Sequence, residues 1–314
     1  MKNHLVSVAA AVPRLRVGDI DFNTKQITEM IASLPDCGLV VFPELSVTGY
    51  TGADLFQSEL LLQKAQEALL QIAEATKPAG LTAVVGAPVR FGNSLYNCGA
   101  VLSQGKVKAL IPKAYLPNYS EFYECRWFAS GRGLNGKTVR MGEEDIPFGM
   151  DILAADDDTG AVLGVELCED LWVPDKPSTH LALAGANIIG NLSASDELIG
   201  KQECRDQDRD NHLGQIHEPS GPADLRLVHS GFGCCSPRDL FHNLFFRLLT
   251  HVAAILFHAH DSTCFSVCIF VSAPFPVDCG AKVERSRELF FRVLRFKRFL
   301  THSASCNRPT HKTT

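Results

Sequence analysis

An apolar run that ends in a carboxylate occupies residues 38–45, which read GLVVFPEL. A short, fully apolar run is typical of a strand that is buried on both faces of a sheet. Glu44 follows this run directly, so we expect its carboxyl group to be partly desolvated, a setting that suits general-base work. Taken alone, Glu44 also fits a surface carboxylate that caps the next turn.

Two further stretches place a reactive side chain just after a strand-like run. Residues 111–119 read IPKAYLPNY, which holds Lys113 on a stiff loop as a fixed point charge. Residues 165–172 read VELCEDLW, which puts Cys168 at the end of a strand and before an acidic pair. A helix start there would favour the thiolate, whereas the adjacent carboxylates oppose it. Taken alone, Lys113 also fits an exposed edge strand, and Cys168 also fits a buried apolar cysteine.

The three stretches together supply a carboxylate, an ammonium and a thiol. These groups are sufficient to attack an amide, hold the resulting oxyanion and transfer the proton. The glycines at 131, 133 and 136 do not follow a strand-like run, so we interpret them as loop residues and not as a phosphate-binding loop. Histidines and cysteines at positions 251, 258, 260, 264 and 268 fit no common zinc spacing, so we predict no metal site.

The bulk composition is that of an ordinary globular protein, with 314 residues, 46% of them hydrophobic and 21% charged. A formal net charge of -5 gives no support for nucleic-acid binding. We predict no membrane span, because the apolar stretch 243–257 is interrupted by Arg247 and His251. Residues 5–12 fit either the core of a secretory signal or a buried first strand, and the helix pattern that follows Pro13 favours the strand.

Strand-like and helix-like patterns alternate along the first 201 residues. A helix is predicted over 24–34 after a polar entry at 19–23, a second over about 54–76 with Asp54 as its N-cap, and a third over about 177–184. Strands are predicted over residues 4–12, 38–43, 81–89, 94–103, 106–112, 146–154, 161–167 and 188–192, with a hairpin turn at 104–105. This alternation of strands and helices predicts an α/β layered domain.

The amino-acid composition changes after Lys201. Seven of the eleven cysteines and nine of the eleven histidines lie beyond it, and we identify no helix or strand there that continues the earlier rhythm. We interpret this as a composition break, of the kind expected where two unrelated reading frames meet. The prediction is one domain over residues 1–201 and a divergent Cys/His/Phe-rich tail of unknown structure over 202–314. The cysteines before the break lack paired spacing, which favours a reducing, cytoplasmic setting.

Taken together, the motifs resemble the nitrilase, or carbon-nitrogen hydrolase, superfamily, and in particular the N-terminal glutaminase domain of glutamine-dependent NAD synthetases. The resemblance covers residues 4–201 and implies a four-layer αββα sandwich that is incomplete or altered after about residue 201. It is carried by FPEL at 42–45 with TGY at 48–50, by LPNY at 116–119 with FYE at 122–124, by CEDLW at 168–172, and by NLSAS at 191–195.

The resemblance implies a role for each matched residue. Glu44, Lys113 and Cys168 correspond to the Glu-Lys-Cys triad of the family, and Glu124 to a second glutamate that supports it. Cys168 would attack the side-chain amide of glutamine, Glu44 would carry the proton to the leaving ammonia, and Lys113 would stabilise the oxyanion. Four further residues would bind glutamine: Tyr119, Phe122, Ser195 and Lys201.

The resemblance also implies partners and cofactors. In this family the ammonia passes to a synthetase domain that uses ATP and Mg to amidate nicotinic acid adenine dinucleotide to NAD, and members form large homo-oligomers. The hydrolase domain is expected to need no cofactor. The Ser-Gly-Gly-x-Asp-Ser loop of that synthetase domain does not occur in these 314 residues, so we expect that domain to be absent here. Two alternatives stay open, namely a free-standing amidase acting on another small amide and an inactive truncated product.

Overall fold

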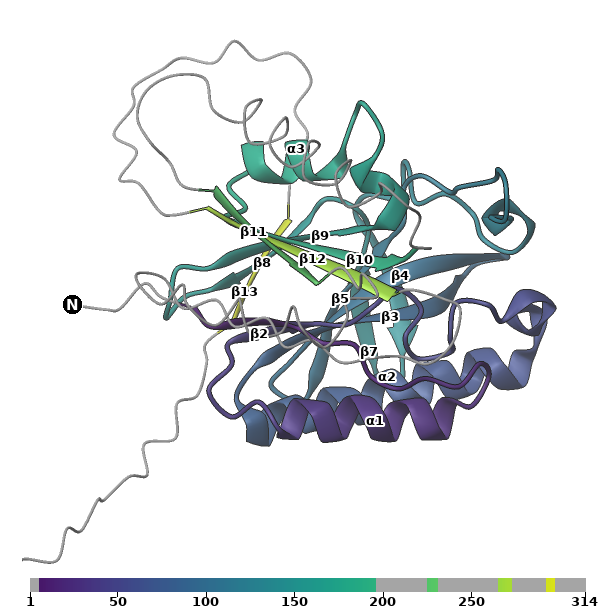
Figure 1. Ribbon diagram of the computed structural model, residues 1–314, viewed down its shortest axis with the longest axis horizontal. Coiled ribbons are helices and arrows are strands. Elements are labelled where there is room, and N and C mark those ends of the chain that lie inside the picture. The colour runs from purple at the N-terminus through teal and green to yellow at the C-terminus, as the bar shows by residue number, and fades with distance from the viewer. Residues whose placement is uncertain (1–5, 196–224, 231–264, 273–291, 297–314) are drawn as a thin grey trace, which may run out of the picture.

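Two β-sheets lie face to face between outer helices in the computed structural model of the chain (Figure 1). The structure describes residues 6–195, 225–230, 265–272 and 292–296. Helices α1 (Ile20–Ala32) and α2 (Glu59–Ala79) cover the outer face of the first sheet, and helix α3 (Pro177–Leu183) covers the outer face of the second. The predicted four-layer αββα sandwich is therefore confirmed.

The first sheet contains seven strands: β1 (Val8–Ala10), β2 (Leu39–Val41), β3 (Thr82–Phe91), β4 (Ser94–Ser103), β5 (Lys106–Pro112), β6 (Lys137–Met141) and β7 (Glu144–Phe148). Their order is β1-β2-β3-β4-β5-β7-β6. Strand β3 pairs parallel with β2 and antiparallel with β4, and β4 pairs antiparallel with β5. Strands β2 and β5 therefore run in the same direction and end at the same edge of the sheet. The predicted β4–β5 hairpin turns through Gln104 and Gly105, which both have positive φ.

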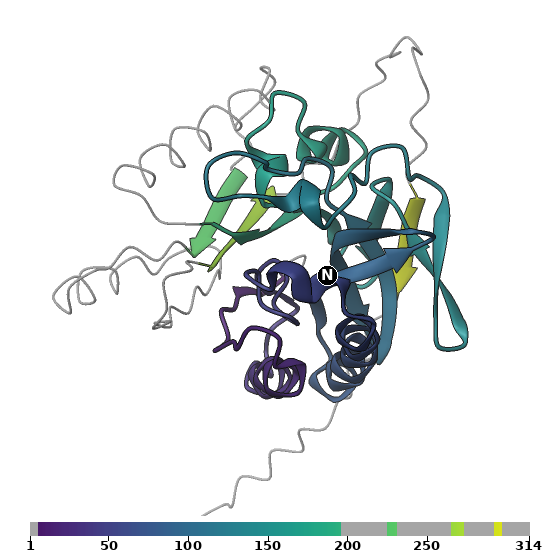
Figure 2. The ribbon, with the colours of Figure 1, turned by 90° about the vertical axis from the view of Figure 1, so that its right-hand side faces the viewer.

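The second sheet contains six strands: β8 (Ile152–Asp156), β9 (Val162–Leu167), β10 (Ile188–Ala194), β11 (Leu225–Ser230), β12 (Phe265–Ser272) and β13 (Arg292–Phe296). Their order is β11-β12-β10-β9-β8-β13, so β11 and β13 form opposite edges (Figure 2).

We identified no strand beyond residue 201 that continues the earlier rhythm and left the structure of the tail unassigned, whereas the structure forms strands β11, β12 and β13 there. Strand β12 pairs antiparallel with β10 over residues 265–271, and that partner lies more than 70 residues earlier in the sequence. Residues 265–272 read FSVCIFVS, a run rich in β-branched and aromatic residues, so a local strand signal was present there and was overlooked. The rest of the predicted tail, and the histidines and cysteines considered for zinc, lie outside the described side chains.

The helices begin at side-chain caps. Asp19 caps α1, because its carboxylate accepts a backbone N–H of the first turn at 3.1 Å, so the helix begins four residues before the predicted residue 24. Helix α2 begins later than predicted, since Ser58 caps it in place of Asp54. Asp54 lies instead in a short 3-10 helix, η1 (Ala53–Gln57), and pairs with Arg126. Within the described part of the chain, no helix combines the length and the apolar character needed to cross a bilayer.

The apolar run at residues 146–154, predicted as one strand, forms two strands in different sheets. Strand β7 ends in the first sheet at Phe148, and β8 begins in the second at Ile152. Both halves are apolar because both sheets bury them, so the hydrophobic pattern carries no sign of the break. The hairpin of β6 and β7 was also missed, although buried Val139 and Met141 alternate with exposed polar residues along β6 in the pattern of a half-buried strand.

An aliphatic core fills the space between the two sheets. Val84 and Ile111 of the first sheet meet Val165 and Leu192 of the second in this core. A separate core joins the first sheet to α1 and α2. The apolar runs recognised in the sequence therefore fix where β2, β5 and β9 end, and the side chains that follow these strands come together between the sheets.

Candidate active site

The carboxylate of Glu44 is fully buried just beyond β2 and accepts three hydrogen bonds. Its Oε1 atom accepts one from Nδ2 of Asn97 and one from Nζ of Lys113, each at 2.7 Å. Its Oε2 atom accepts the backbone N–H of Ala194 in the second sheet at 3.0 Å. Glu44 is therefore held by both sheets, and its orientation is fixed by donors on each side.

A glycine in the neighbouring strand makes room for this segment. A Cβ atom on Gly86 of β3 would lie 2.2 Å from the backbone nitrogen of Leu45 and 2.5 Å from the carbonyl oxygen of Pro43. Contacts this short with backbone atoms cannot be relieved by a side-chain rotation. The backbone that carries Glu44 thus lies against a position that only glycine fits.

Lys113 lies between two buried carboxylates. Its Nζ atom is 2.7 Å from Oε1 of Glu44 and 2.7 Å from Oε1 of Glu124. The hydroxyl of Tyr50 donates to the same Glu124 oxygen at 2.7 Å. The other oxygen of Glu124 is buried and has no hydrogen-bond partner among the described residues. Glu124 itself is presented by the short 3-10 helix η2 (Glu124–Arg126) in the loop after β5.

The electrostatics of this group favour a charged lysine. Burial alone lowers the pKa of Lys113, but the charges of Glu44 and Glu124 outweigh it and hold that pKa well above its ordinary value. Burial raises the pKa of Glu124, and the Lys113 charge opposes this rise. One ammonium therefore faces two carboxyl groups in a site shielded from water.

Cys168 is the first residue of the 3-10 helix η3 (Cys168–Leu171), directly after β9. Its φ of 43° is a left-handed conformation that a residue with a Cβ rarely adopts, and the side chain is buried. Burial and the Glu44 charge raise the pKa of the Cys168 thiol, whereas the Lys113 charge and a hydrogen bond with Ser193 lower it. The charges of Glu44 and Lys113 thus act on the pKa of the thiol in opposite directions.

The predicted glutamine-binding residues occupy the loop after Lys113 and the end of β10. Tyr119 is 55% exposed, and its hydroxyl donates to Oε2 of Glu169 at 2.9 Å. The ring of Phe122 lies edge-on to the rings of Tyr119 and Tyr50. Ser195 is half-buried one residue beyond β10, and Lys201 lies outside the described residues. The structure brings Glu44, Lys113, Glu124 and Cys168 into one site, with Tyr119 and Phe122 beside it.

Sequence reasoning missed four residues that contact the site. Asn97 interrupts the buried apolar part of β4, which was an available signal, and Ser193 lies with Asn191 in the NLSAS motif already singled out. Tyr50 and Asp170 lie within motifs already singled out, but no local pattern reveals which groups they bind. Asp170 is buried, and burial with the Glu166 charge raises its pKa to about 8, whereas backbone N–H donors and the Lys113 charge lower it.

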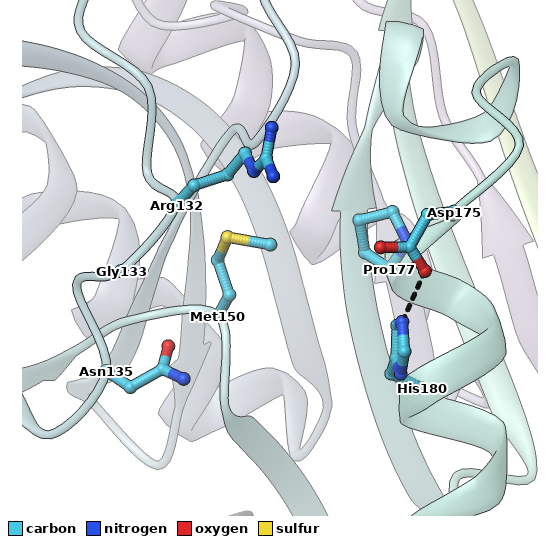
Figure 3. A pocket seen from close by; sticks show the side chains of 7 residues that line it. All are labelled: Arg132, Gly133, Asn135, Met150, Asp175, Pro177 and His180. Atoms are coloured by element: carbon cyan, nitrogen blue, oxygen red, sulfur yellow. Dashed lines mark hydrogen bonds and ion pairs between the residues drawn. The ribbon is translucent and has the colours of Figure 1, made fainter. Parts of the chain in front are cut away.

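A surface cavity of about 250 Å³ lies apart from this site, between the loop after η2 and α3 (Figure 3). Arg132 and Met150 face Asp175 and His180 across it, and the last two pair at 2.6 Å. The loop belongs to residues 131–138, which read GRGLNGKT and share the spacing of a phosphate-binding loop. Such a loop joins a strand to a helix, whereas this one leads into β6, so its glycines are loop residues as predicted.

Comparison with known proteins agrees with the fold and the motifs. Residues 7–217 match the family model described as carbon-nitrogen hydrolase. A glutamine-dependent NAD(+) synthetase of Mycobacterium tuberculosis is 42% identical over 203 residues, which cover 64% of this chain and 30% of that protein. The corresponding protein of Thermotoga maritima is 33% identical over 65% of this chain and 32% of its own length. The chain spans about a third of the length of the curated relatives it matches.

A solved structure shows the same similarity. The crystal structure of a glutamine-dependent NAD(+) synthetase from Cytophaga hutchinsonii aligns with a TM-score of 0.57 and 29% identity, over 67% of this chain and 33% of that chain. The family model covers more than half of the 314 residues, and the matched region contains every strand that positions Glu44, Lys113 and Cys168. The chain therefore belongs to the carbon-nitrogen hydrolase family, and it carries the hydrolase domain found in relatives named glutamine-dependent NAD(+) synthetases.

Proposed function

We propose that the chain hydrolyses the side-chain amide of glutamine through a thioester on Cys168. The observation that carries the proposal is the buried group in which the Lys113 ammonium lies 2.7 Å from the Glu44 carboxylate, with both charges acting on the Cys168 thiol. The choice of glutamine is supported by the relatives, which are named glutamine-dependent NAD(+) synthetases.

The proposed reaction has two halves. In the first, Sγ of Cys168 attacks the carbonyl carbon of the amide while the thiol proton passes to Glu44. The C–N bond then breaks, the proton moves from Glu44 to the leaving nitrogen, and ammonia departs from a thioester. In the second half, Glu44 takes a proton from water, the hydroxide attacks the thioester, and glutamate leaves as the thiol regains its proton.

The site has the groups that each step needs. The neutral thiol requires a base at the moment of attack, and Glu44 is fixed for that task by Asn97, Lys113 and Ala194. Negative charge develops on the carbonyl oxygen, where Lys113 and the backbone N–H that follows Cys168 would stabilise it. Glu124 keeps Lys113 charged and in place through their 2.7 Å contact.

Residues of the surrounding loops would hold the rest of the substrate. Tyr119 and Phe122 stand beside the triad, and we propose that they contact glutamine together with Ser195 and Lys201. We further propose that the released ammonia serves the ATP- and Mg-dependent amidation of nicotinic acid adenine dinucleotide to NAD by a synthetase domain outside these 314 residues. A cytoplasmic location and a homo-oligomeric state belong to the same proposal.

Ammonia release from glutamine by the purified chain tests the proposal, with Cys168→Ala as the blank. Release from the parent chain that Cys168→Ala abolishes, while its thermal transition is kept, is the expected result. Equal release by both proteins would remove Cys168 as the nucleophile. Release from other small amides but not from glutamine would support the alternative of a free-standing amidase. The absence of any cooperative thermal transition would support the alternative of an inactive product.

A further inference from the structure

The carboxyl group of Asp170 accepts hydrogen bonds from backbone groups at the ends of one strand in each sheet, β5 and β9. Its Oδ1 atom accepts the N–H of Tyr115 at 2.8 Å and that of Ala114 at 3.1 Å. Its Oδ2 atom accepts the N–H of Leu167 at 3.1 Å. The side chain is 1% exposed, so these contacts are made away from water.

The three donors flank the two reactive groups that must meet. Ala114 and Tyr115 directly follow Lys113, where the chain leaves β5 of the first sheet. Leu167 directly precedes Cys168, where the chain leaves β9 of the second. A single carboxyl group thus joins the segment that carries the ammonium to the segment that carries the thiol.

We propose that Asp170 is a positioning residue that sets the separation between Nζ of Lys113 and Sγ of Cys168. This inference rests on the proposed function, because it concerns the same site. Glu44 is tied to the second sheet independently through Ala194, whereas the ion pairs of Lys113 in the described part of the chain are with Glu44 and Glu124, neither of which lies in the second sheet. Loosening the Asp170 contacts therefore moves Lys113 relative to the thiol while Glu44 stays in place.

The neighbouring Glu166 provides a matched comparison. It is also 1% exposed, and it lies on β9, four residues before Asp170. Its oxygens accept the backbone N–H of Ser178 at 2.9 Å and Nδ2 of Asn191 at 3.2 Å, and both partners lie on the side of the second sheet. Glu166→Gln therefore removes a buried carboxyl group without releasing the contact between the sheets.

Asp170→Asn tests the inference, because it keeps the size of the side chain but turns one acceptor into an NH2 group that faces N–H donors. A displacement of about 1 Å at a reacting group costs on the order of 100-fold in rate. We expect kcat for amide hydrolysis to fall about 100-fold with KM changed less than about threefold, whereas Glu166→Gln keeps kcat within about threefold of the parent value. Equal kcat in the two variants would overturn the inference.

Alkylation of Cys168 by iodoacetamide separates this inference from the proposed function, since it needs no knowledge of the substrate. Lys113 favours the thiolate, so its displacement in Asp170→Asn should slow alkylation at pH 8 by about tenfold relative to Glu166→Gln. That slowing would support the inference even if the parent chain hydrolysed no amide, and an unchanged rate would overturn it even if glutamine were hydrolysed.

If Asp170→Asn does not fold, amide hydrogen exchange in the parent protein tests the same inference without a variant. Amides held by a buried carboxyl group exchange only when the local structure opens. We expect the amides of Ala114, Tyr115 and Leu167 to exchange slowly and with similar protection. Fast exchange at Ala114 and Tyr115, with Leu167 still protected, would overturn the proposed connection between the two segments.

Discussion

Nζ of Lys113 lies 2.7 Å from Oε1 of Glu44, and neither side chain is exposed. A buried ion pair of this kind contributes little net stability, because desolvation of both charges offsets their attraction. The free-energy cost of burying these two charges is explained by a chemical role, since a fixed ammonium and a fixed carboxylate beside a thiol are the groups that amide hydrolysis needs.

Removing the lysine should damage both stability and activity. Lys113→Met leaves Glu44 and Glu124 buried without their cation, and breaking a buried pair in this way costs about 3–5 kcal/mol. We expect urea unfolding to show that loss and the ammonia assay to show no release. Lys64→Met is the control, because it breaks a 2.8 Å pair with Asp21 at the surface and should change neither readout appreciably. Similar losses in the two variants would contradict this account.

A methyl group on Gly86 should displace the segment that carries Glu44. The added Cβ would meet backbone atoms of Leu45 and Pro43 at 2.5 Å or less, so the strands must separate. We expect Gly86→Ala to lose about 1–3 kcal/mol of stability, as overpacked cores do, together with most of the amide hydrolysis. Gly190→Ala, where the nearest atom is 3.5 Å away, should retain activity. An active, fully stable Gly86→Ala variant would show that the Glu44 segment is not held against β3.

The hydrogen bond from Asn97 to Glu44 should matter more for rate than for folding. Asn97→Leu removes the Nδ2 donor that lies 2.7 Å from Oε1 of Glu44. A hydrogen bond to a charged group is worth about 1.5–3 kcal/mol, so we expect kcat to fall at least about tenfold. Asn187→Leu is the control, because Asn187 bonds backbone groups of Gly160 and Val162, at the end of β9 opposite to Cys168. Asn187→Leu should lose stability yet keep kcat, and the reverse pattern would contradict the role of Asn97.

Apolar runs made most of the fold predictable from the sequence, together with the positions of Glu44, Lys113 and Cys168 at strand ends, whereas the roles of these three residues were implied by the family resemblance. The residues before Glu44, Lys113 and Cys168 are buried on both faces, so their strands and the side chains at their ends were visible in the pattern.

Where two local signals for a helix start compete, tertiary contacts decide between them. Asp54 and Ser58 are both good N-caps, and Asp54 fails to cap α2 because Arg126 and Trp127 bind its carboxylate.

The supporting contacts of the site were not predictable from local pattern. Asp170 accepts N–H groups that lie 55 and 56 residues earlier in the chain, and the amide of Ala194 reaches Glu44 across 150 residues. Such contacts exist only once the two sheets are packed face to face. The sequence marks polar residues in apolar surroundings, as at Asn97, but not the atoms that they bind.

The pH dependence of Cys168 alkylation should separate the two roles of Glu44. Burial and the Glu44 charge both raise the pKa of the thiol, so the thiolate is scarce at neutral pH and alkylation should rise with pH beyond the ordinary thiol range, about 8.5. Glu44→Gln removes one charge that raises this pKa. Its alkylation profile should therefore shift to lower pH, although hydrolysis is lost with the base.

In Glu44→Gln, Cys168 should thus react faster with iodoacetamide, while the variant should not hydrolyse an amide. Mass spectrometry of the Cys168 peptide measures the first property and ammonia release the second, with exposed Cys125 as an internal reference for the reagent. A shift of the Glu44→Gln profile to higher pH would mean that Glu44 stabilises the thiolate indirectly, by fixing Lys113 beside it, and does not act on the thiol through its own charge. A direct effect of the Glu44 charge and an indirect effect through Lys113 shift the alkylation profile in opposite directions, so the direction of the shift decides between them.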